Sequence, residues 1–507
     1  MTHAATPAEP TIGRRLAAAS LRLRTIAATL LALFVLDNII LLGLLGVSSL
    51  LVFALALIMP PVLAILVIRT MPGEKHIAFS TIFVCLAIAA ILLMLGGEGR
   101  LFFATDDWQI RDAVLADMGT HRWPFDYWLD GQAQMLRAPV GMYLVPALIG
   151  GASQLGRDWV LLAHNSLILG LVLMLGSALF KGRRAQLIAL VTFITFSGLD
   201  VIGTLIHQSF SGEADWEHIE RWAYQSQYSA HITQIFWVPH HAFAGWACAI
   251  TYLLWRRGLA PIGLFGASLP LVALWSPLVL FGALPFAAFA GIRTLLTGAW
   301  DKRDILLCIV ATAVAIPALL YLATDAQTVG GGIRPLPPAI YILVMLLEVV
   351  PFILPLLRDR DVAADRATVM IAGICLLLMP LWKIGSSTDF QMRASIMPLA
   401  LVAIAFADWA NRLNRLDTKA YFLTIIALAS LTGMVEIARV FRFAPSPVPH
   451  CSLAGIWSRQ TGLIVPHAAY FAARGAFPFN VIPADRVSIA NPDICWDQQW
   501  RSPRRGL

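Results

Sequence analysis

Charged residues are scarce in this sequence. Asp, Glu, Lys and Arg make up 13% of its 507 residues, whereas hydrophobic residues make up 58%. Soluble domains are typically about 25% charged. The composition therefore excludes an ordinary soluble enzyme and indicates an all-α protein that crosses a membrane many times. The net charge of +7 does not indicate nucleic-acid binding, because most Lys and Arg residues lie in short loops that set the orientation of membrane helices.

Cysteine is also scarce, and the six cysteines are unevenly placed. Four of them fall within apolar segments, where we expect small buried side chains. Cys451 and Cys495 lie in the C-terminal tail instead. If this tail is outside the cytoplasm, the oxidising environment favours a disulfide between them over two free thiols.

Long apolar segments are abundant. A membrane-spanning helix needs about 20 apolar residues. The first such segment has no small-residue cleavage site, so we expect it to remain as a helix and not to be removed as a signal peptide. We predict thirteen spans, at 26–46, 48–68, 77–97, 158–180, 185–206, 236–255, 258–274, 276–293, 304–324, 337–357, 367–384, 394–410 and 419–440.

The basic residues decide how one further apolar stretch is interpreted. The stretch 139–155 is bracketed by Arg137 and Arg157, so we interpret it as a helix along the membrane interface. Counting it as a span would place the basic turns at 181–184 and 256–257 outside, whereas basic loops tend to stay in the cytoplasm.

With the basic loops and the N-terminus in the cytoplasm, the chain divides into three parts. We predict a cytoplasmic N-terminal tail at 1–25, a transmembrane domain at 26–440 with a large outer-face loop at 98–157, and an outer-face tail at 441–507. Apolar residues recur at helical spacing within 108–120, which predicts an amphipathic helix on the membrane surface. The expected location is the inner membrane of a bacterium, with the N-terminus cytoplasmic and the C-terminus periplasmic.

Two adjacent acids, Asp106 and Asp107, follow the third predicted span directly. A carboxylate there can act as a general base on an acceptor hydroxyl, or hold a divalent metal beside a phosphate. The alternative is that Thr105 or Asp106 caps a helix that starts near Trp108. The cofactor stays open, because no ligand spacing requires a metal.

Other polar residues near the predicted outer boundary are candidates for substrate binding. They are Arg137, His240, His241, Lys383, Asp389 and Arg393. Arginine is the natural bidentate partner of a phosphate, although an arginine there can also extend towards lipid headgroups. The two adjacent histidines cannot easily ligate one metal ion together, since neighbouring helix residues point in different directions. The alternative is that they bond to loop backbone.

Four features resemble the GT-C class of integral-membrane glycosyltransferases. The acidic pair opens a large outer loop, the amphipathic segment 108–120 follows it, the stretch 137–148 resembles the interfacial helix of that class, and a basic turn at 181–184 comes one helix later. The resemblance covers about residues 98–206, and the rest resembles the class in topology alone. The loop follows the third predicted span here, whereas in that class it usually follows the first.

The resemblance implies a reaction and its substrates. Asp106 or Asp107 would be the catalytic base or a metal ligand, with Asp106 slightly preferred because it is nearer the end of the span. The donor would be a polyprenyl-phosphate-linked sugar that enters from the membrane lipids, with its phosphate held by Arg393, Arg137 or Lys383. The acceptor hydroxyl would displace the lipid phosphate on the outer face of the membrane.

Three other functions stay open. A polysaccharide polymerase or ligase uses similar outer-face Arg and His residues, and an assembly partner would use the outer loops to bind protein. A transporter of a lipid-linked or anionic solute is expected to carry charges deep within its spans. The predicted spans are nearly free of charge, with Glu348 the main exception, which argues against a proton-coupled carrier.

Overall fold

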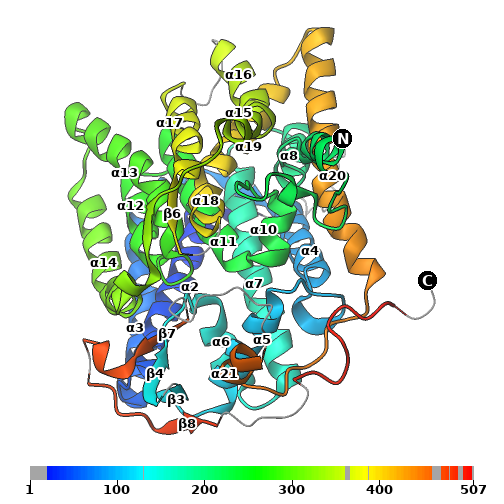
Figure 1. Ribbon diagram of the computed structural model, residues 1–507. Helices are drawn as coiled ribbons and strands as arrows, with labels where there is room; N and C mark the ends of the chain where they lie inside the picture. Colours follow the sequence, from blue (N-terminus) through cyan, green and yellow to red (C-terminus); the bar gives the residue numbers. More distant parts are fainter. Residues whose placement is uncertain are drawn as a thin grey trace, which may run out of the picture.

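The computed structural model describes residues 20–129, 131–359, 366–385, 388–459, 470–478, 480–488 and 495–504. Its helices form a bundle, and the four strands β3, β4, β7 and β8 gather with α5, α6 and α21 at one end, drawn at the bottom of Figure 1. We call this end of the molecule the loop end.

The elements of the first half of the chain are mainly helices. They are β1 (Ser20–Arg22), α2 (Leu23–Leu44), α3 (Ser49–Thr70), β2 (His76–Ala78), α4 (Phe79–Leu95), α5 (Trp108–Thr120), β3 (Phe125–Leu129), β4 (Gln132–Leu136), α6 (Gly141–Gly150), α7 (Gln154–Ser177), α8 (Arg183–Ile194), α9 (Asp200–Ser211), α10 (His231–Trp237) and α11 (Pro239–Arg256).

The second half continues the same pattern. Its elements are α12 (Ile262–Leu271), α13 (Pro277–Thr297), α14 (Lys302–Ala323), β5 (Gly331–Ile333), α15 (Pro338–Val344), a π-helical turn (Met345–Val349), α16 (Val350–Arg358), α17 (Arg366–Leu378), β6 (Trp382–Ile384), α18 (Asp389–Ala394), α19 (Ile396–Ala410), α20 (Leu416–Arg442), α21 (Leu453–Arg459), β7 (Phe471–Ala473) and β8 (Asp485–Val487).

Among the described residues, seven helices are long and apolar enough to cross a membrane. They are Leu23–Leu44, Ser49–Thr70, Gln154–Ser177, Pro277–Thr297, Lys302–Ala323, Pro338–Arg358 and Leu416–Arg442. Large apolar side chains are exposed along α3, including Leu50 and Phe53, which is compatible with a lipid environment. The mostly helical membrane fold therefore agrees with the sequence, and the count of thirteen spans stays a prediction.

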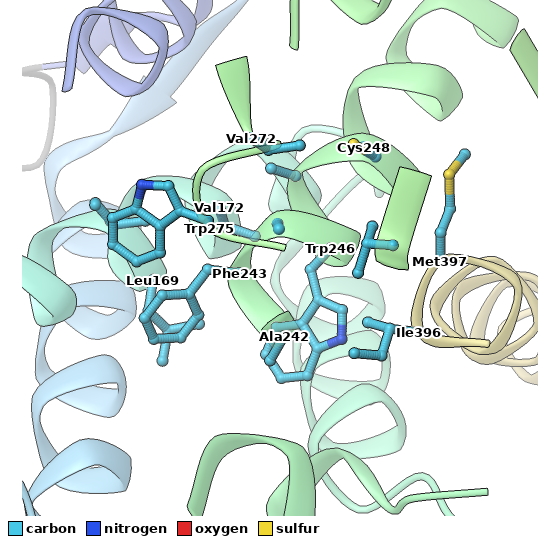
Figure 2. Close-up of a cluster of buried hydrophobic side chains, with 14 of the residues drawn as sticks. Leu169, Val172, Ala242, Phe243, Trp246, Cys248, Val272, Trp275, Ile396 and Met397 are labelled. Carbon is cyan, nitrogen blue, oxygen red and sulfur yellow. The ribbon is translucent and has the colours of Figure 1, made fainter. Parts of the chain in front are cut away.

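Helix α11 lies in the core of the bundle. Its residues from Pro239 to Leu254 are buried, and small Ala and Gly residues between the aromatic ones allow close approach of neighbouring helices. Figure 2 shows Trp246 beside Ile396 of α19, and Phe243 beside Trp275. The Trp246 indole Nε1 donates a hydrogen bond to Gln234 Oε1 at 3.1 Å, so its polar atom is satisfied.

A small sheet at the loop end joins the large loop to the C-terminal tail. Its strand order is β7-β4-β3-β8, in which β3 and β4 form an antiparallel hairpin and β8 pairs with β3 in parallel. Buried Asp126 on β3 accepts hydrogen bonds from Arg474 at 2.9 Å and Arg486 at 3.0 Å. The prediction of an all-α fold therefore omitted this small mixed sheet, to which the tail supplies strands.

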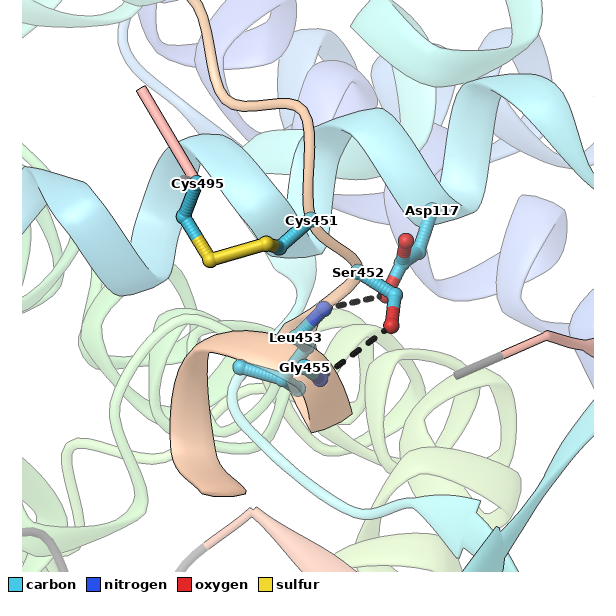
Figure 3. Close-up of a disulfide and its surroundings, with 6 residues drawn as sticks. All are labelled: Asp117, Cys451, Ser452, Leu453, Gly455 and Cys495. Carbon is cyan, nitrogen blue, oxygen red and sulfur yellow. Dashed lines mark hydrogen bonds between the residues drawn. A yellow bond between two sulfur atoms is a disulfide. The ribbon is translucent and has the colours of Figure 1, made fainter. Parts of the chain in front are cut away.

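The predicted disulfide between Cys451 and Cys495 is confirmed. Figure 3 shows it beside α5, where the Leu453 backbone N–H donates to Asp117 at 2.8 Å. The Tyr127 hydroxyl donates to the same carboxylate oxygen at 2.8 Å. The disulfide therefore closes a loop within the tail, and the hydrogen bond from Leu453 to Asp117 attaches this part of the tail to α5.

The basic turns meet at the opposite end of the bundle. Arg257 lies 3.7 Å from Asp408, and Arg303 donates to the backbone oxygen of Arg69 at 3.3 Å. Arg412 lies 4.0 Å from Asp359. These contacts involve five turns that the sequence predicts on one side of the membrane, three in one group and two in another. We call this the basic end.

Two local predictions from the sequence are wrong. Residues 185–206 are not one helix, because α8 ends at Ile194 and α9 starts at Asp200. Helix α5 starts where expected, but its polar residues Arg111, Asp112 and Asp117 are buried with its apolar ones. It therefore packs within the loop end instead of lying on a membrane surface with an exposed polar side.

The stretch at 139–155 forms the 10-residue α6, which is too short to span a bilayer.

Candidate functional site

The two candidate acids, Asp106 and Asp107, lie in the turn before α5, and their side chains have different partners. Trp108 Nε1 donates to the backbone oxygen of Phe236 at 2.8 Å, which holds the start of α5 against the end of α10. Asp107 is the capping residue, and no side chain accepts a capping hydrogen bond there. The alternative role of the acids as helix caps therefore has no support in the geometry, and their side chains have other partners.

Asp106 faces the C-terminal tail. Arg501 forms a two-point contact with its carboxylate, in which Nε lies 3.1 Å from Oδ1 and Nη2 contacts Oδ2. Arg501 also lies 3.7 Å from Glu217. Asp106 is thus part of a surface ion-pair network that links the loop to the tail.

Asp107 instead pairs with Arg111, one helical turn further on. Arg111 Nη2 lies 3.1 Å from Asp107 Oδ2, and the exposed fractions of the two side chains are 5% and 39%. The carboxylate thus reaches solvent while its partner is buried. Tyr143 of α6 and Tyr470 of the tail both lie within electrostatic range of this pair.

The same place receives residues from α11 and α18. The charges of Arg111 and Arg393 both act on the buried ring of His240. Arg393 lies 2.5 Å from Asp389, its partner one turn earlier on α18. The charges of Asp107, Arg111, Asp389 and Arg393 also act on the Tyr470 phenol. We call Asp107, Arg111, His240, Arg393 and Tyr470 the loop-end cluster.

The two histidines lie against each other, although they are adjacent in a helix. Their ring centroids are 3.9 Å apart. His241 Nδ1 shares a hydrogen bond of 2.7 Å with Ser276 Oγ, whereas no described residue bonds to Nδ1 of His240. His240 therefore has one buried ring nitrogen without a described partner, and the ring of His241 packs against it.

Each arginine of the cluster is paired with a carboxylate, Arg111 with Asp107 and Arg393 with Asp389. Burial disfavours the charged form of Arg111, but Asp107 and the neighbouring phenols outweigh this effect, so the pKa of Arg111 is raised. Desolvation raises the pKa of Tyr470, and the charge of Arg111 opposes part of the increase. Two arginines and the Tyr470 phenol thus lie near two carboxylates, Asp107 and Asp389. Arginine can bind a phosphate, and a carboxylate beside it can act as a base.

Two predicted binding residues lie elsewhere. The buried Arg137 guanidinium interacts electrostatically with Tyr321 and Asp325 at the end of α14, and burial lowers the pKa of Arg137. Lys383 is exposed on the two-stranded β5–β6 sheet. Within the described part of the chain, no group of three or more His, Cys, Asp or Glu residues could hold a metal ion, and we assign no metal-dependent step.

The sequence did not identify Arg111 and Tyr470 as members of the cluster, or Tyr143 as their neighbour. Only Arg111 had a usable signal, since it lies four residues after Asp107 on a predicted helix. Tyr470 arrives from the tail, where its backbone oxygen accepts a hydrogen bond from the Arg137 N–H at 2.7 Å. No short-range pattern connects residues this far apart in the chain.

Comparisons with known proteins give no relative. No family model matches the chain, and neither a curated protein nor a solved structure matches it.

Proposed function

We propose that the protein is a membrane glycosyltransferase that moves a sugar from a polyprenyl-phosphate-linked donor to an acceptor on the outer face of a bacterial inner membrane. The observation that carries this proposal is the convergence of Asp107, Arg111, His240 and Arg393 at the loop end. A base and two arginines are what transfer from a lipid phosphate requires. In this proposal the loop end is periplasmic.

The proposed reaction uses few groups. Asp107 takes the proton of the acceptor hydroxyl, and the acceptor oxygen forms a bond to the anomeric carbon. The bond between that carbon and the phosphate oxygen breaks, and the lipid phosphate leaves with the electron pair. Arg393 and Arg111 stabilise the phosphate charge, since charge-assisted hydrogen bonds are the strongest that arginine makes. In this proposal His240 Nδ1, which has no described partner, bonds to the donor or acceptor.

The test compares two matched variants, Asp107→Asn and Asp106→Asn. General-base catalysis is typically worth about 10²–10⁴-fold, so Asp107→Asn is expected to lower transfer by that factor. Asp106→Asn weakens the contact with Arg501 and is expected to have a far smaller effect. The measurement is transfer of labelled sugar from polyprenyl-phosphate donors by purified, correctly inserted protein.

Two results contradict the assignment. Loss of transfer in Asp106→Asn alone would move the base to Asp106, as the sequence preferred. Normal transfer by the double variant would remove the loop from catalysis altogether. Activity only on preassembled glycan chains would indicate a polymerase or ligase.

A second candidate function is a proton-coupled carrier, and a buried acid favours it. Asp37 of α2 is fully buried, and Trp275 Nε1 donates to its Oδ2 at 3.1 Å. His164 Nε2 lies 3.8 Å from Oδ1, which has no described hydrogen-bond partner. Ionisable residues inside a helix bundle commonly mark solute or proton pathways. The spans thus hold more charge than the sequence suggested, and loss of solute uptake in Asp37→Asn would support the carrier.

A further inference from the structure

A second group of buried acids lies apart from the loop-end cluster, between α9, the π-helical turn and α20. Asp200 begins α9 and is 1% exposed, and Glu348 within the π-helical turn is 4% exposed. The hydroxyls of Ser197 and Thr432 donate to Asp200 Oδ2 at 2.7 and 2.8 Å. One carboxylate oxygen of Asp200 is thus occupied by two donors.

Gly198 leaves space for the carboxyl group of Glu348, and Gly203 leaves space for the ring of Trp222, which bonds to Glu348. A Cβ on Gly198 would lie 1.5 Å from Glu348 Oε2, and a Cβ on Gly203 would lie 2.3 Å from the Trp222 ring. Trp222 Nε1 donates to Glu348 Oε1 at 3.2 Å. No donor among the described residues reaches Oε2. The Leu199 N–H donates to the Leu347 backbone oxygen at 3.2 Å, which brings Asp200 beside Glu348, and the two carboxyl groups are close enough to share a proton.

A hydrogen bond between two carboxyl groups requires a proton. Ionised carboxylates are acceptors only, and two of them at this separation in a buried site cannot both carry a charge. We propose that Asp200 and Glu348 form a binding site for one proton, which exchanges with the loop end through Glu220, His218 and Glu436. The π-helical turn that presents Glu348 is a kind of distortion found frequently at functional sites.

The next acid on this path is Glu220. It accepts hydrogen bonds from the Ala230 N–H at 2.7 Å, from Thr233 at 2.6 Å and from Gln227 at 2.9 Å. Burial, with a contribution from the charge of Asp200, raises the pKa of Glu220 to about 8. Its protonated and ionised forms are therefore both accessible near neutral pH, which suits a group that passes protons.

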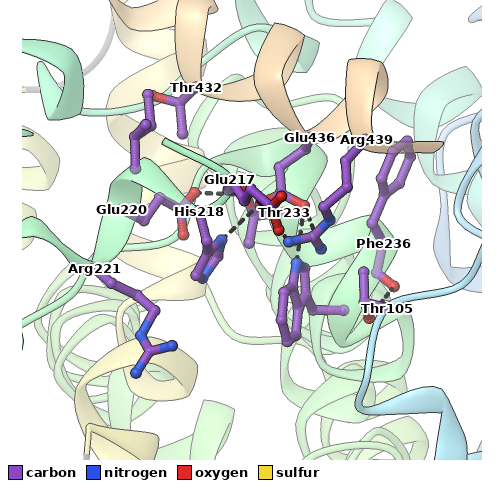
Figure 4. Close-up of polar contacts among 12 residues, drawn as sticks. Thr105, Glu217, His218, Glu220, Arg221, Thr233, Phe236, Thr432, Glu436 and Arg439 are labelled. Atoms are coloured by element: carbon purple, nitrogen blue, oxygen red, sulfur yellow. Dashed lines mark hydrogen bonds and ion pairs between the residues drawn. The ribbon is translucent and has the colours of Figure 1, made fainter. Parts of the chain in front are cut away.

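His218 and Glu436 connect Glu220 to the surface (Figure 4). His218 Nδ1 lies 2.7 Å from Glu436 Oε1. Burial disfavours the charged ring, but the hydrogen bond to Glu436 and the charges of Glu436 and Glu220 together outweigh this effect, so the pKa of His218 is raised. Trp237 Nε1 donates to Glu436 Oε2 at 3.0 Å, and Arg439 lies 3.1 Å from the same oxygen.

The surroundings of the path are also defined. Arg439 stacks over the Trp237 ring at 4.9 Å and donates to the backbone oxygen of Glu217 at 3.4 Å. The Glu217 side chain is 36% exposed and pairs with Arg442 at 2.7 Å. The charge of Glu348 also acts on the phenol of Tyr228, whose hydroxyl donates to the Leu376 backbone oxygen.

The experiment is infrared difference spectroscopy of the purified full-length protein in lipid. Protonated carboxyl groups have a carbonyl stretching band that shifts in D₂O. Glu348→Gln and Asp200→Asn each supply an amide donor in place of the proton, so each variant is expected to lose one such band relative to the wild type at neutral pH. Asp126→Asn is the matched control, because Asp126 is bonded to two arginines and is expected to contribute no such band.

Three outcomes of the infrared experiment would contradict the proposal. If neither Glu348→Gln nor Asp200→Asn removes a band, the pair holds no proton and the proposal is overturned. If the band survives in Asp200→Asn alone, the proton belongs to Glu348 by itself, which contradicts a shared site. His218→Gln is expected to slow the exchange of the band after transfer to D₂O, and an unchanged rate would exclude the proposed path. These readouts are independent of sugar transfer.

Discussion

At the scale of single residues, Arg100 organises the start of the large loop. Its guanidinium lies 2.9 Å from Asp112 and 2.8 Å from Asp158, and it donates to the Pro447 backbone at 2.7 Å. Its backbone has a φ of 56°, a left-handed conformation that non-glycine residues adopt at a cost. Three acceptors from α5, α7 and the tail hold this strained residue in place.

The acid that faces Arg100 is expected to make stability depend on pH. Burial raises the pKa of Asp112 from 3.8 to about 6, although Arg100 opposes the increase. The folded state therefore holds this proton more tightly than the unfolded state does, and stability falls as pH rises from about 4 to 6, by on the order of 3 kcal/mol. Asp112→Asn is expected to remove this part of the dependence in melting curves, and parallel curves for variant and wild type would contradict it.

The same scale shows which site residues a sequence can reveal. Asp107 and His240 were candidates from their position next to predicted spans, and both lie in the loop-end cluster. Asp106 and Arg137 had similar signals but face Arg501 and Tyr321. A turn directs adjacent side chains apart, and the direction depends on partners from the tail, which no local pattern contains.

At the scale of elements, the disulfide is expected to stabilise the layer formed by the loop and the tail. Cys451 and Cys495 are 44 residues apart, and closing a loop of this length is worth about 4 kcal/mol in the chain-entropy model. Replacing both by serine is expected to lower the melting temperature, with Cys308→Ser as the control that removes a free thiol. Equal melting temperatures for all three proteins would exclude a stabilising role.

Elements also show where hydrophobicity is an insufficient guide. The apolar run at 185–206 predicted one helix, but the chain breaks after Ile194. The Leu199 N–H donates to the Leu347 backbone oxygen at 3.2 Å, and Gly198 makes room for Glu348. Contacts with the π-helical turn therefore replace helical ones. In contrast, the start of α5 and the long helices α2, α3, α13, α14 and α20 follow directly from apolar length and periodicity.

At the scale of the whole molecule, the two ends differ in composition and connection. The basic end joins short turns through Arg257, Arg303 and Arg412. The loop end contains the mixed sheet, the disulfide and most of the longer connections. Excess Lys and Arg on one side favour the cytoplasm, and a disulfide favours an oxidising compartment. Both tendencies indicate the same orientation, with the loop end outside the cytoplasm.

This orientation can be tested with two single cysteines on opposite sides of α8 and α9. Lys181 and Glu213 are both exposed, so a thiol at either position is open to reagents. A membrane-impermeant maleimide applied to intact cells with a permeable outer membrane is expected to label Glu213→Cys and to leave Lys181→Cys unlabelled until the inner membrane is disrupted. The reverse pattern would place the basic turn at 181–184 outside. It would require an additional crossing before α7, which would have to include the stretch at 139–155, and the loop-end cluster and the turn at 181–184 could then no longer be assigned to opposite sides of one membrane.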